Sequence, residues 1–371
     1  MVFLPSFFVP GIVSRYVTRR TMLAVGGALG VLSAVIVLSN FVELTRQVNP
    51  AWGDVPTESL LWLALLQSPG VILLVMPFAF LFGVLIAFMN LNRRSELIAL
   101  RAAGVSAWRF VTPAAVAAAL VGLLTMTALN PVASELTATF ERLKTQMLDG
   151  PAGQNKTIWL RQGDRRHSII IRARSNQGPG VHLKGVTLFV NKVGADGRPQ
   201  LEQRFEAADA VLRRNTWTLT GVHTFSPGGL GVTSPRLEVP SDLNEHTALE
   251  RFGSTNGEPF WSLPAIIARS EAAGISSTPY RLQLQQLLAT PLLYAAMAVL
   301  AAAFSLRLLR LGGMAQFAGS GVALGFVFFF FNQLCSSLGK SDVLPPVVAA
   351  WAPPVMALLA GITLLCYTED G

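Results

Sequence analysis

The stretch VILLVMPFAFLFGVLIAFMNLNRRSELIALRAAG, residues 71–104, decides the fold. Residues 71–90 are almost all apolar, and about 20 such residues suffice for a helix to cross a bilayer. Arg93 and Arg94 follow, and after them come a Ser-Glu pair and a short amphipathic segment. A long apolar run that ends in arginines is typical of a transmembrane helix arriving at the cytoplasmic face.

The composition of the whole chain points to a membrane protein. Of its 371 residues, 51% are hydrophobic and 13% are charged, whereas soluble domains carry about 25% charged residues. The net charge of +8 raises the question of a nucleic-acid partner. Because the basic residues stand mostly at the ends of apolar runs, membrane topology explains them and no nucleic-acid binding is expected.

Six apolar segments are long enough to span a bilayer. They are residues 21–43, 69–90, 108–130, 287–306, 314–338 and 345–367. The apolar stretch 60–68 precedes the second segment and is read either as an interfacial helix or as an extension of that span. The sequence therefore predicts six transmembrane helices in two groups of three.

The distribution of basic residues predicts the orientation of these spans. Nine arginines flank one set of span ends, whereas the opposite short loops hold only Arg46 and Lys340. By the positive-inside rule, both termini and the loop 91–108 are expected in the cytoplasm. The nine are Arg15, Arg19, Arg20, Arg93, Arg94, Arg101, Arg109, Arg307 and Arg310. The first span has no small-residue cleavage site after it and is expected to stay as an anchor.

Between the two groups of spans lies an insert of a different character. It contains short β-branched and aromatic runs such as KTIWLRQ, HSIIIRARS and TWTLTGVHTF, with turn signals at 177–180 and 195–197. Many short strands without intervening helical patterns favour a sandwich, a barrel or a jelly roll. Segments with a helical sequence pattern, 133–148 and 263–274, flank the strands. Residues 239–262 are interpreted as either an ordered strap or a flexible linker.

The predicted fold is a membrane α-helical protein with six transmembrane helices and an inserted extracytoplasmic all-β, jelly-roll-like domain. Its parts are an N-terminal transmembrane half (1–133), a β domain with flanking helical segments (134–286) and a C-terminal transmembrane half (287–371). Alternation along the strands predicts that six side chains face the β-domain interior, which is either a closed core or an open groove. They are Ile158, Leu160, Ile169, Ile171, Trp217 and Leu219.

The spans lack the residues that ion-driven transport or intramembrane catalysis requires. The second, fourth and sixth contain no Asp, Glu, Lys, Arg or His, so neither a proton relay nor a metalloprotease site is expected. The triplet at 339–341 resembles the end of a P-loop, but position 334 is Leu where that motif needs Gly. We therefore expect no catalytic residue, no metal and no cofactor in this chain, and an energy source outside it.

The loop after the second span has the pattern of a short capped helix. Ser95 is a suitable N-cap, and Glu96 suits the first turn. Leu97, Leu100 and Gly104 follow at i, i+3 and i+7, and Gly104 is a suitable C-cap. The loop is either a connector with topogenic arginines or a docking helix for a cytosolic partner.

The same loop, RRSELIALRAAGVSAWRF at 93–110, resembles the coupling loop of the LptF/LptG family. The sequences RYVTRR at 15–20 and FVEL at 41–44 also resemble this family, as do residues 280–307 and 344–365. The resemblance covers nearly the whole chain and is weakest in the β domain. Phe-Val-Glu is similar to the Phe-Val-Asp pattern of the LptG branch.

This resemblance implies a permease subunit of a Gram-negative lipopolysaccharide exporter in the inner membrane. Such subunits pair as an LptF/LptG heterodimer on a dimer of the ATPase LptB, which binds ATP and Mg²⁺. The β domain passes lipopolysaccharide to LptC and then to LptA. The implied ATPase-coupling residues are Arg94, Ser95, Glu96, Leu97, Leu100, Arg101 and Gly104.

In this family the first and fifth spans form lateral gates for lipid. Each of these spans here carries a Gly-x-x-x-Gly motif, which also occurs in ordinary helix packing. The implied gate and lipid-binding residues are Gly26, Gly30, Asn40, Phe41, Glu43, Arg46, Gly321 and Gly325. Asn40 stands where related sequences often carry a cation, and Arg46 is the candidate to replace that charge.

Two other functions remain open at this point. One is a permease subunit of another ABC exporter, which moves lipoprotein or drug by mechanotransmission and needs no lateral gate. The other is a membrane-anchored scaffold. A membrane-anchored enzyme is less favoured, because the β domain shows no nucleophile–base pair or metal cluster.

Overall fold

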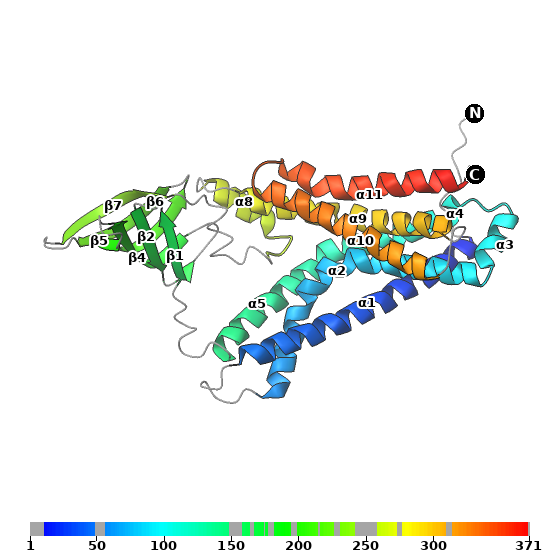
Figure 1. Ribbon diagram of the computed structural model, residues 1–371, viewed down its shortest axis with the longest axis horizontal. Helices are drawn as coiled ribbons and strands as arrows, with labels where there is room; N and C mark the ends of the chain where they lie inside the picture. Colours follow the sequence, from blue (N-terminus) through cyan, green and yellow to red (C-terminus); the bar gives the residue numbers. More distant parts are fainter. Residues whose placement is uncertain are drawn as a thin grey trace.

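Six long apolar helices dominate the computed structural model, and they confirm the six predicted spans (Figure 1). Three precede the β domain: α1 (Ile12–Gln47), α2 (Thr57–Arg93) and a continuous helix from Trp108 to Met147. Three follow it: α9 (Thr278–Leu308), α10 (Met314–Lys340) and α11 (Pro346–Glu369). The structure describes residues 11–48, 56–147, 158–163, 167–173, 175–176, 182–193, 199–213, 216–225, 231–241, 258–272, 277–308 and 314–369.

The helices are longer than the apolar segments from which they were predicted. The stretch 60–68 belongs to α2, so it extends the second span and is not a separate interfacial helix. The third helix consists of α4 (Trp108–Leu124), a π-turn η2 (Thr125–Leu129) and α5 (Asn130–Met147). Helical hydrogen bonding continues into polar sequence because residues such as Glu, Leu and Lys favour helix outside the membrane as well.

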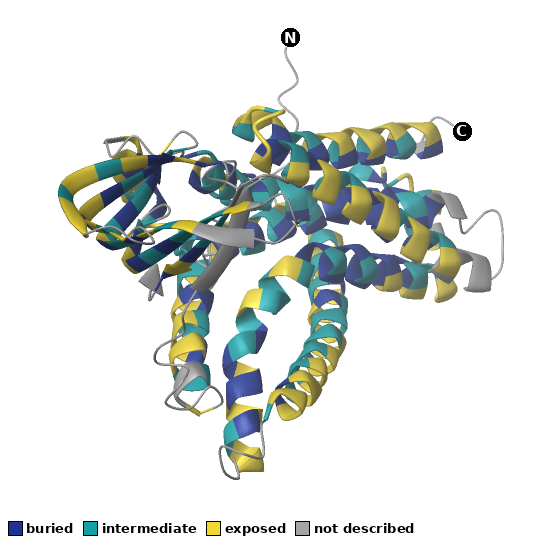
Figure 2. Cartoon of the chain, turned by 60° about the vertical axis from the view of Figure 1, so that its left-hand side comes forward, coloured by how far each residue is buried: buried dark blue, intermediate teal, exposed yellow. Residues whose placement is uncertain are grey.

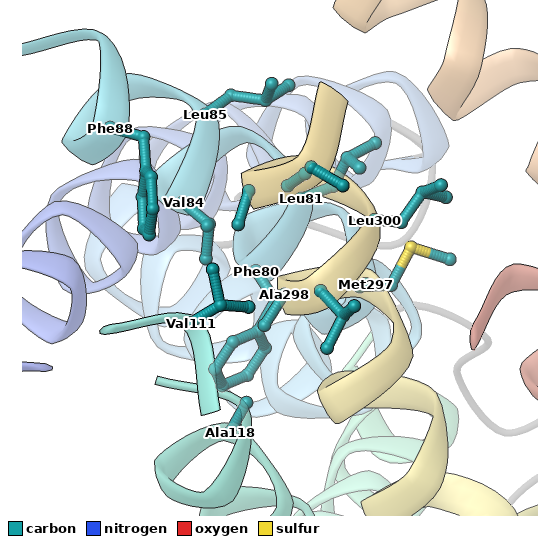
Figure 3. Close-up of a cluster of buried hydrophobic side chains, with 14 of the residues drawn as sticks. Phe80, Leu81, Val84, Leu85, Phe88, Val111, Ala118, Met297, Ala298 and Leu300 are labelled. Atoms are coloured by element: carbon teal, nitrogen blue, oxygen red, sulfur yellow. The ribbon is translucent and has the colours of Figure 1, made fainter. Parts of the chain in front are cut away.

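The six helices share one hydrophobic core only toward the end that carries the short helix α3 (Glu96–Ala102). Figure 3 shows this core, in which Phe80 and Phe88 of α2 lie among side chains of α4 and α9. Toward the β domain, α1, α2 and α5 have a separate cluster around Leu63 and Phe140. A further cluster at Leu282 joins α9 to α11. The two groups of helices are thus joined at one end and apart at the other (Figure 1).

Glycines allow the helices to touch backbone to backbone within the shared core. A Cβ atom on Gly83 of α2 would lie 2.4 Å from the Cα of Val25 on α1. A Cβ on Gly122 of α4 would lie 2.5 Å from the Cα of Pro291 on α9. Small residues at such positions let membrane helices approach closely.

The insert is a single antiparallel sheet, which confirms the predicted all-β domain. Its strands pair in the order β1-β2-β4-β5-β6-β7, and β3 pairs with β4. This up-and-down order is simpler than the two Greek keys of a full jelly roll. The strands are β1 (Ile158–Gly163), β2 (His167–Ala173), β3 (Ser175–Asn176), β4 (His182–Val193), β5 (Pro199–Arg213), β6 (Thr216–Phe225) and β7 (Val232–Pro240). The turn signals at 177–180 and 195–197, and Arg310, lie outside the described residues.

A short helix, α8 (Leu263–Ala272), confirms the helical text predicted after the strands and ends beside the start of α9. The Glu271 carboxylate there accepts hydrogen bonds from Arg281 Nε at 2.9 Å, from Arg281 Nη2 at 2.6 Å and from Ser277 Oγ at 2.9 Å. The arginine first, and then the serine, hold the pKa of Glu271 below its ordinary value. This contact joins the end of α8 to the start of α9.

The lowered pKa predicts how this contact depends on pH. A depressed carboxyl pKa stabilises the fold above the ordinary pKa, and that contribution is lost as pH falls through the folded-state pKa. We expect Glu271→Gln to lower the thermal unfolding temperature at pH 7, and we expect this difference from the parent chain to shrink as the pH falls below the ordinary carboxyl pKa. Unfolding curves across this range test it, with Glu135→Gln on α5 as the control. A constant difference at all pH values would contradict the prediction.

Candidate functional site

The helix α3 lies at the end of the helices farthest from the sheet (Figure 1). Ser95 is the N-cap residue of α3, as predicted, but its side chain does not bond the helix N-terminus. Ser95 has a φ of 56° and makes no side-chain cap bond. The chain reverses between α2 and α3, and this sharp turn uses the left-handed conformation at Ser95, at some cost for a residue with a Cβ.

The other end of α3 has the predicted glycine cap. Gly104 has a φ of 75°, a conformation that glycine adopts without steric cost. Its N–H donates to the Arg101 carbonyl at 2.9 Å, and the Val105 N–H donates to the Leu100 carbonyl at 3.1 Å. These two bonds form a Schellman motif, which ends the helix and satisfies its last carbonyls.

Three contacts tie α3 to distant parts of the chain. Leu97 inserts into the shared core and is 3% exposed. The Glu96 carboxylate accepts a hydrogen bond from the Tyr16 hydroxyl of α1 at 3.0 Å. Arg101 Nη2 donates to the Thr368 carbonyl of α11 at 3.2 Å. The short helix is therefore connected directly to the first and to the last transmembrane helix.

Among the described side chains of α3, those away from the core are mostly small and exposed. Arg94 at its start and Gly104 at its end are exposed, whereas Leu100 is half-buried. Between them Ala99, Ala102 and Ala103 are exposed as well. A small-residue face of this kind lets another protein surface approach the helix backbone closely. Sequence reasoning missed Tyr16, although this residue stands in the RYVTRR segment that it singled out.

The predicted lipid-binding residues of α1 lie at its other end. Asn40 Nδ2 donates to Ser68 Oγ of α2 at 3.3 Å, so this amide joins the two helices. Phe41 packs against the separate cluster of α1, α2 and α5. Glu43 accepts a hydrogen bond from Gln47 at 2.9 Å, and Arg46 is exposed beside it. Glu43 and Arg46 are therefore the charged groups that this end of α1 presents to its surroundings.

The two Gly-x-x-x-Gly motifs differ in their surroundings. Gly321 and Gly325 of α10 are buried against α2, and a Cβ on Gly321 would lie 2.9 Å from Leu85 Cδ1. Gly26 and Gly30 of α1 are exposed, and a Cβ on either would meet nothing within 4 Å. The α10 motif therefore serves packing inside this chain, and the α1 motif is free to meet a lipid or another protein.

The β-domain interior is packed at its centre. Ile171, Trp217 and Leu219 lie in the buried cluster and are at most 1% exposed, whereas Ile169 is half-buried at its margin. Buried and more exposed residues alternate along the first half of β6, and the sheet contains buried, half-buried and exposed residues (Figure 2). The backbones of Ile158 and Leu160 pair with Ala173 and Ile171 in the register of β1 and β2. The central residues thus form a closed core in the isolated chain.

The polar groups of the sheet form pairs and not a metal centre. His182 Nε2 lies 3.3 Å from Asp209 Oδ1, and His223 Nδ1 lies 3.0 Å from Thr233 Oγ1. Among the residues that the structure describes, no three His, Cys, Asp or Glu side chains gather as metal ligands would. Both of the chain's cysteines are free.

The fold and the contacts of α3 define a polytopic membrane protein, with the β domain at one end of its spans and the short helix α3 at the other. The family model described as lipopolysaccharide export system permease LptF/LptG matches residues 15–367. The chain therefore belongs to the LptF/LptG family of lipopolysaccharide export permeases. The lipopolysaccharide export system permease protein LptG of Escherichia coli K12 is 20% identical over 361 residues, which are 96% of this chain and 98% of that protein. LptG of E. coli O6:H1 strain CFT073 matches to the same extent.

Proposed function

We propose that this chain is a permease subunit of an ABC transporter that extracts lipopolysaccharide from the inner membrane and passes it to a periplasmic bridge. In this proposal the termini and α3 are cytoplasmic and the β domain is periplasmic. An LptB-like ATPase dimer hydrolyses ATP with Mg²⁺ and docks on α3. An LptF-like permease completes the membrane unit, and LptC-like and LptA-like β proteins receive the lipid.

The observation that carries this proposal is the way α3 is tied to the transmembrane helices. A force on α3 reaches α1 through Glu96 and Tyr16, and α11 through Arg101 and the Thr368 carbonyl. These two helices belong to different groups, which share a core near α3 and have separate cores near the β domain. A small movement at the joined end therefore changes the separation at the open end.

An opening between apolar helices is what the export of a lipid requires. Moving an acyl chain of about 12 methylenes from a bilayer into water costs roughly 10 kcal/mol, so the chain has to stay in apolar surroundings throughout. Val31, Val35 and Leu38 of α1 are exposed apolar residues, as are Phe326 and Phe330 of α10. These side chains would cover the acyl chains of a lipid as it leaves the bilayer.

The packed centre of the β domain refines the site of lipid contact that we propose. Trp217 and Leu219 would have to move apart before an acyl chain could lie over them. Ile169, Val190 and Leu237 are half-buried at the margin of the same cluster. We therefore place first contact with the lipid at this margin, with the central residues exposed only when the sheet opens.

A photocrosslinking experiment tests this proposal. A photoreactive amino acid is placed at Ile169, and the control is Thr220, which is exposed on the outer face of the sheet. In membranes that contain the chain with its co-purifying ATPase and lipopolysaccharide, we expect an adduct at position 169 that requires ATP. No such adduct is expected at position 220.

Each alternative function predicts a different result. A permease subunit for lipoprotein or drug would give ATP turnover without a lipopolysaccharide adduct at position 169. A membrane-anchored scaffold would give no ATP-dependent adduct and no co-purifying ATPase. Equal adducts at positions 169 and 220 would reflect lipid that adsorbs to the domain, and would contradict a specific path.

A further inference from the structure

The segment Glu258–Ser262 returns from the β domain and crosses the third helix at its π-turn. The indole N–H of Trp261 donates to the Thr127 carbonyl at 3.0 Å, although the Trp261 side chain is 66% exposed. The Phe260 N–H donates to Asn130 Oδ1 at 2.9 Å. We call this segment the strap. The preceding residues 242–257 lie outside the described residues.

The strap binds where the helical hydrogen bonding of the third helix is irregular. The hydrogen bonds of a π-turn span five residues where those of an α-helix span four, and such turns are rare and frequently occur at functional sites. The residue four positions after Thr127 is Pro131, which has no N–H to donate to the Thr127 carbonyl. The indole N–H of Trp261 binds this carbonyl instead. Trp261 thus satisfies a backbone acceptor that would otherwise depend on water or lipid, which is costly in apolar surroundings.

The inner side of the π-turn is held by α9. The Tyr294 hydroxyl is hydrogen-bonded to the Thr125 side chain, and both residues are buried. One turn earlier, Gly122 lies against the backbone of Pro291. The α4 half of the third helix is therefore fixed to the second group of helices.

The outer half of the third helix belongs to the other group. Phe140 of α5 is 2% exposed in the cluster with α1 and α2. The contact between α5 and α2 is close, because a Cβ on Gly70 would lie 3.2 Å from Thr137 Oγ1. The π-turn is therefore the point at which the third helix passes from one group of helices to the other.

We infer that η2 is the hinge between the two groups and that the strap links its angle to the position of the β domain. The described ends of both chain connections of that domain lie on this helix, since α5 precedes β1 in the chain and the strap after β7 binds η2. A displacement of the β domain would pull Trp261 away from the π-turn and free α5 to swing. This inference goes beyond the proposed function and does not depend on which substrate the chain moves.

Distance measurements between spin labels test the inference. Labels are placed at Ala138 of α5 and Val347 of α11, which are exposed, after replacement of Cys335 and Cys366. The full-length chain is studied with its co-purifying partners in lipid nanodiscs. Trp261→Phe removes the indole donor and Asn130→Ala removes the acceptor for Phe260. In both variants we expect the distance distribution to widen and its mean to increase.

Two matched controls separate the strap from general disturbance. Asn130→Asp keeps an oxygen acceptor for the Phe260 N–H, and Trp62→Phe changes an exposed tryptophan of α2. Both are expected to keep the parent distribution. Unchanged distributions in Trp261→Phe and Asn130→Ala would overturn the inference. An equal change in either control would overturn it too, because the effect would not require the strap bonds.

Discussion

Replacing Gly122 with alanine is expected to lower the free energy of unfolding by about 1–3 kcal/mol, the usual cost of overpacking a tight core. The new Cβ atom would lie 2.5 Å from Pro291 Cα and 3.0 Å from the Thr290 carbonyl oxygen. Both neighbours are backbone atoms of α9, so the two helices have to move apart as rigid units. Chemical unfolding of the full chain in detergent measures this change.

Gly27→Ala is the matched control for this substitution. Gly27 is exposed on α1, and a Cβ there would meet nothing within 4 Å. Alanine is favoured over glycine in a helix by about 1 kcal/mol, so the control is expected to be neutral or slightly stabilising. Equal effects of the two substitutions would show that α4 and α9 are not in backbone contact at Gly122.

The second large effect is expected from Glu96→Arg. If Glu96 binds the ATPase that we propose to dock on α3, reversal of this charge removes a charge-assisted hydrogen bond to that partner, worth about 1.5–3 kcal/mol. Each 1.4 kcal/mol changes an equilibrium constant about tenfold. We therefore expect recovery of the ATPase with the purified chain to fall by at least about tenfold, and ATP-driven lipid release to be lost.

Two milder substitutions separate docking from transmission inside the chain. Glu96→Gln keeps an acceptor for the Tyr16 hydroxyl but removes the charge, whereas Tyr16→Phe keeps the charge and removes the internal bond. If Glu96 docks the ATPase, the glutamine variant loses ATPase and the phenylalanine variant retains it. Tyr16→Phe is expected to retain ATP turnover while releasing less lipid per ATP. Normal assembly and export in Glu96→Arg would disprove the role of α3 as the docking helix.

The sequence predicted those features of the fold that depend on local pattern. Apolar run length identified the six spans, and β-branched alternation identified the inserted sheet. The Gly104 cap was also predictable, because a glycine that follows a short amphipathic segment is a common helix end. Each of these signals lies within a few residues of the structure that it specifies.

The contacts that tie α3 to α1 and α11 could not be predicted in this way. Tyr16 and Glu96 are 80 residues apart, and Arg101 and Thr368 are 267 residues apart. Only the packed arrangement of the helices brings them together. The same limit applies to Ser95, where the local pattern located the N-cap residue but not its left-handed backbone conformation.

The glycines show a further limit of motif reading. The Gly-x-x-x-Gly pattern drew attention to α1 and α10, yet the closest backbone approaches occur at Gly83 and Gly122. These are single glycines in apolar sequence, and no motif distinguishes them. The π-turn does have a local signal, because Pro131 directly after it removes one N–H from the helical hydrogen bonds, but this signal does not identify Trp261 as the partner.

α2 and the third helix are longer than the hydrocarbon layer of a membrane is thick. α2 spans 37 residues, or about 55 Å at 1.5 Å per residue, and the third helix is at least as long, whereas the hydrocarbon layer is about 30 Å thick. Even a tilted helix of this length extends beyond the hydrocarbon layer. The apolar cluster around Leu63 and Phe140 lies in the part of these helices nearest the β domain. The protein thereby extends apolar surroundings beyond the hydrocarbon layer, and this shortens the distance that an apolar cargo would travel in contact with water.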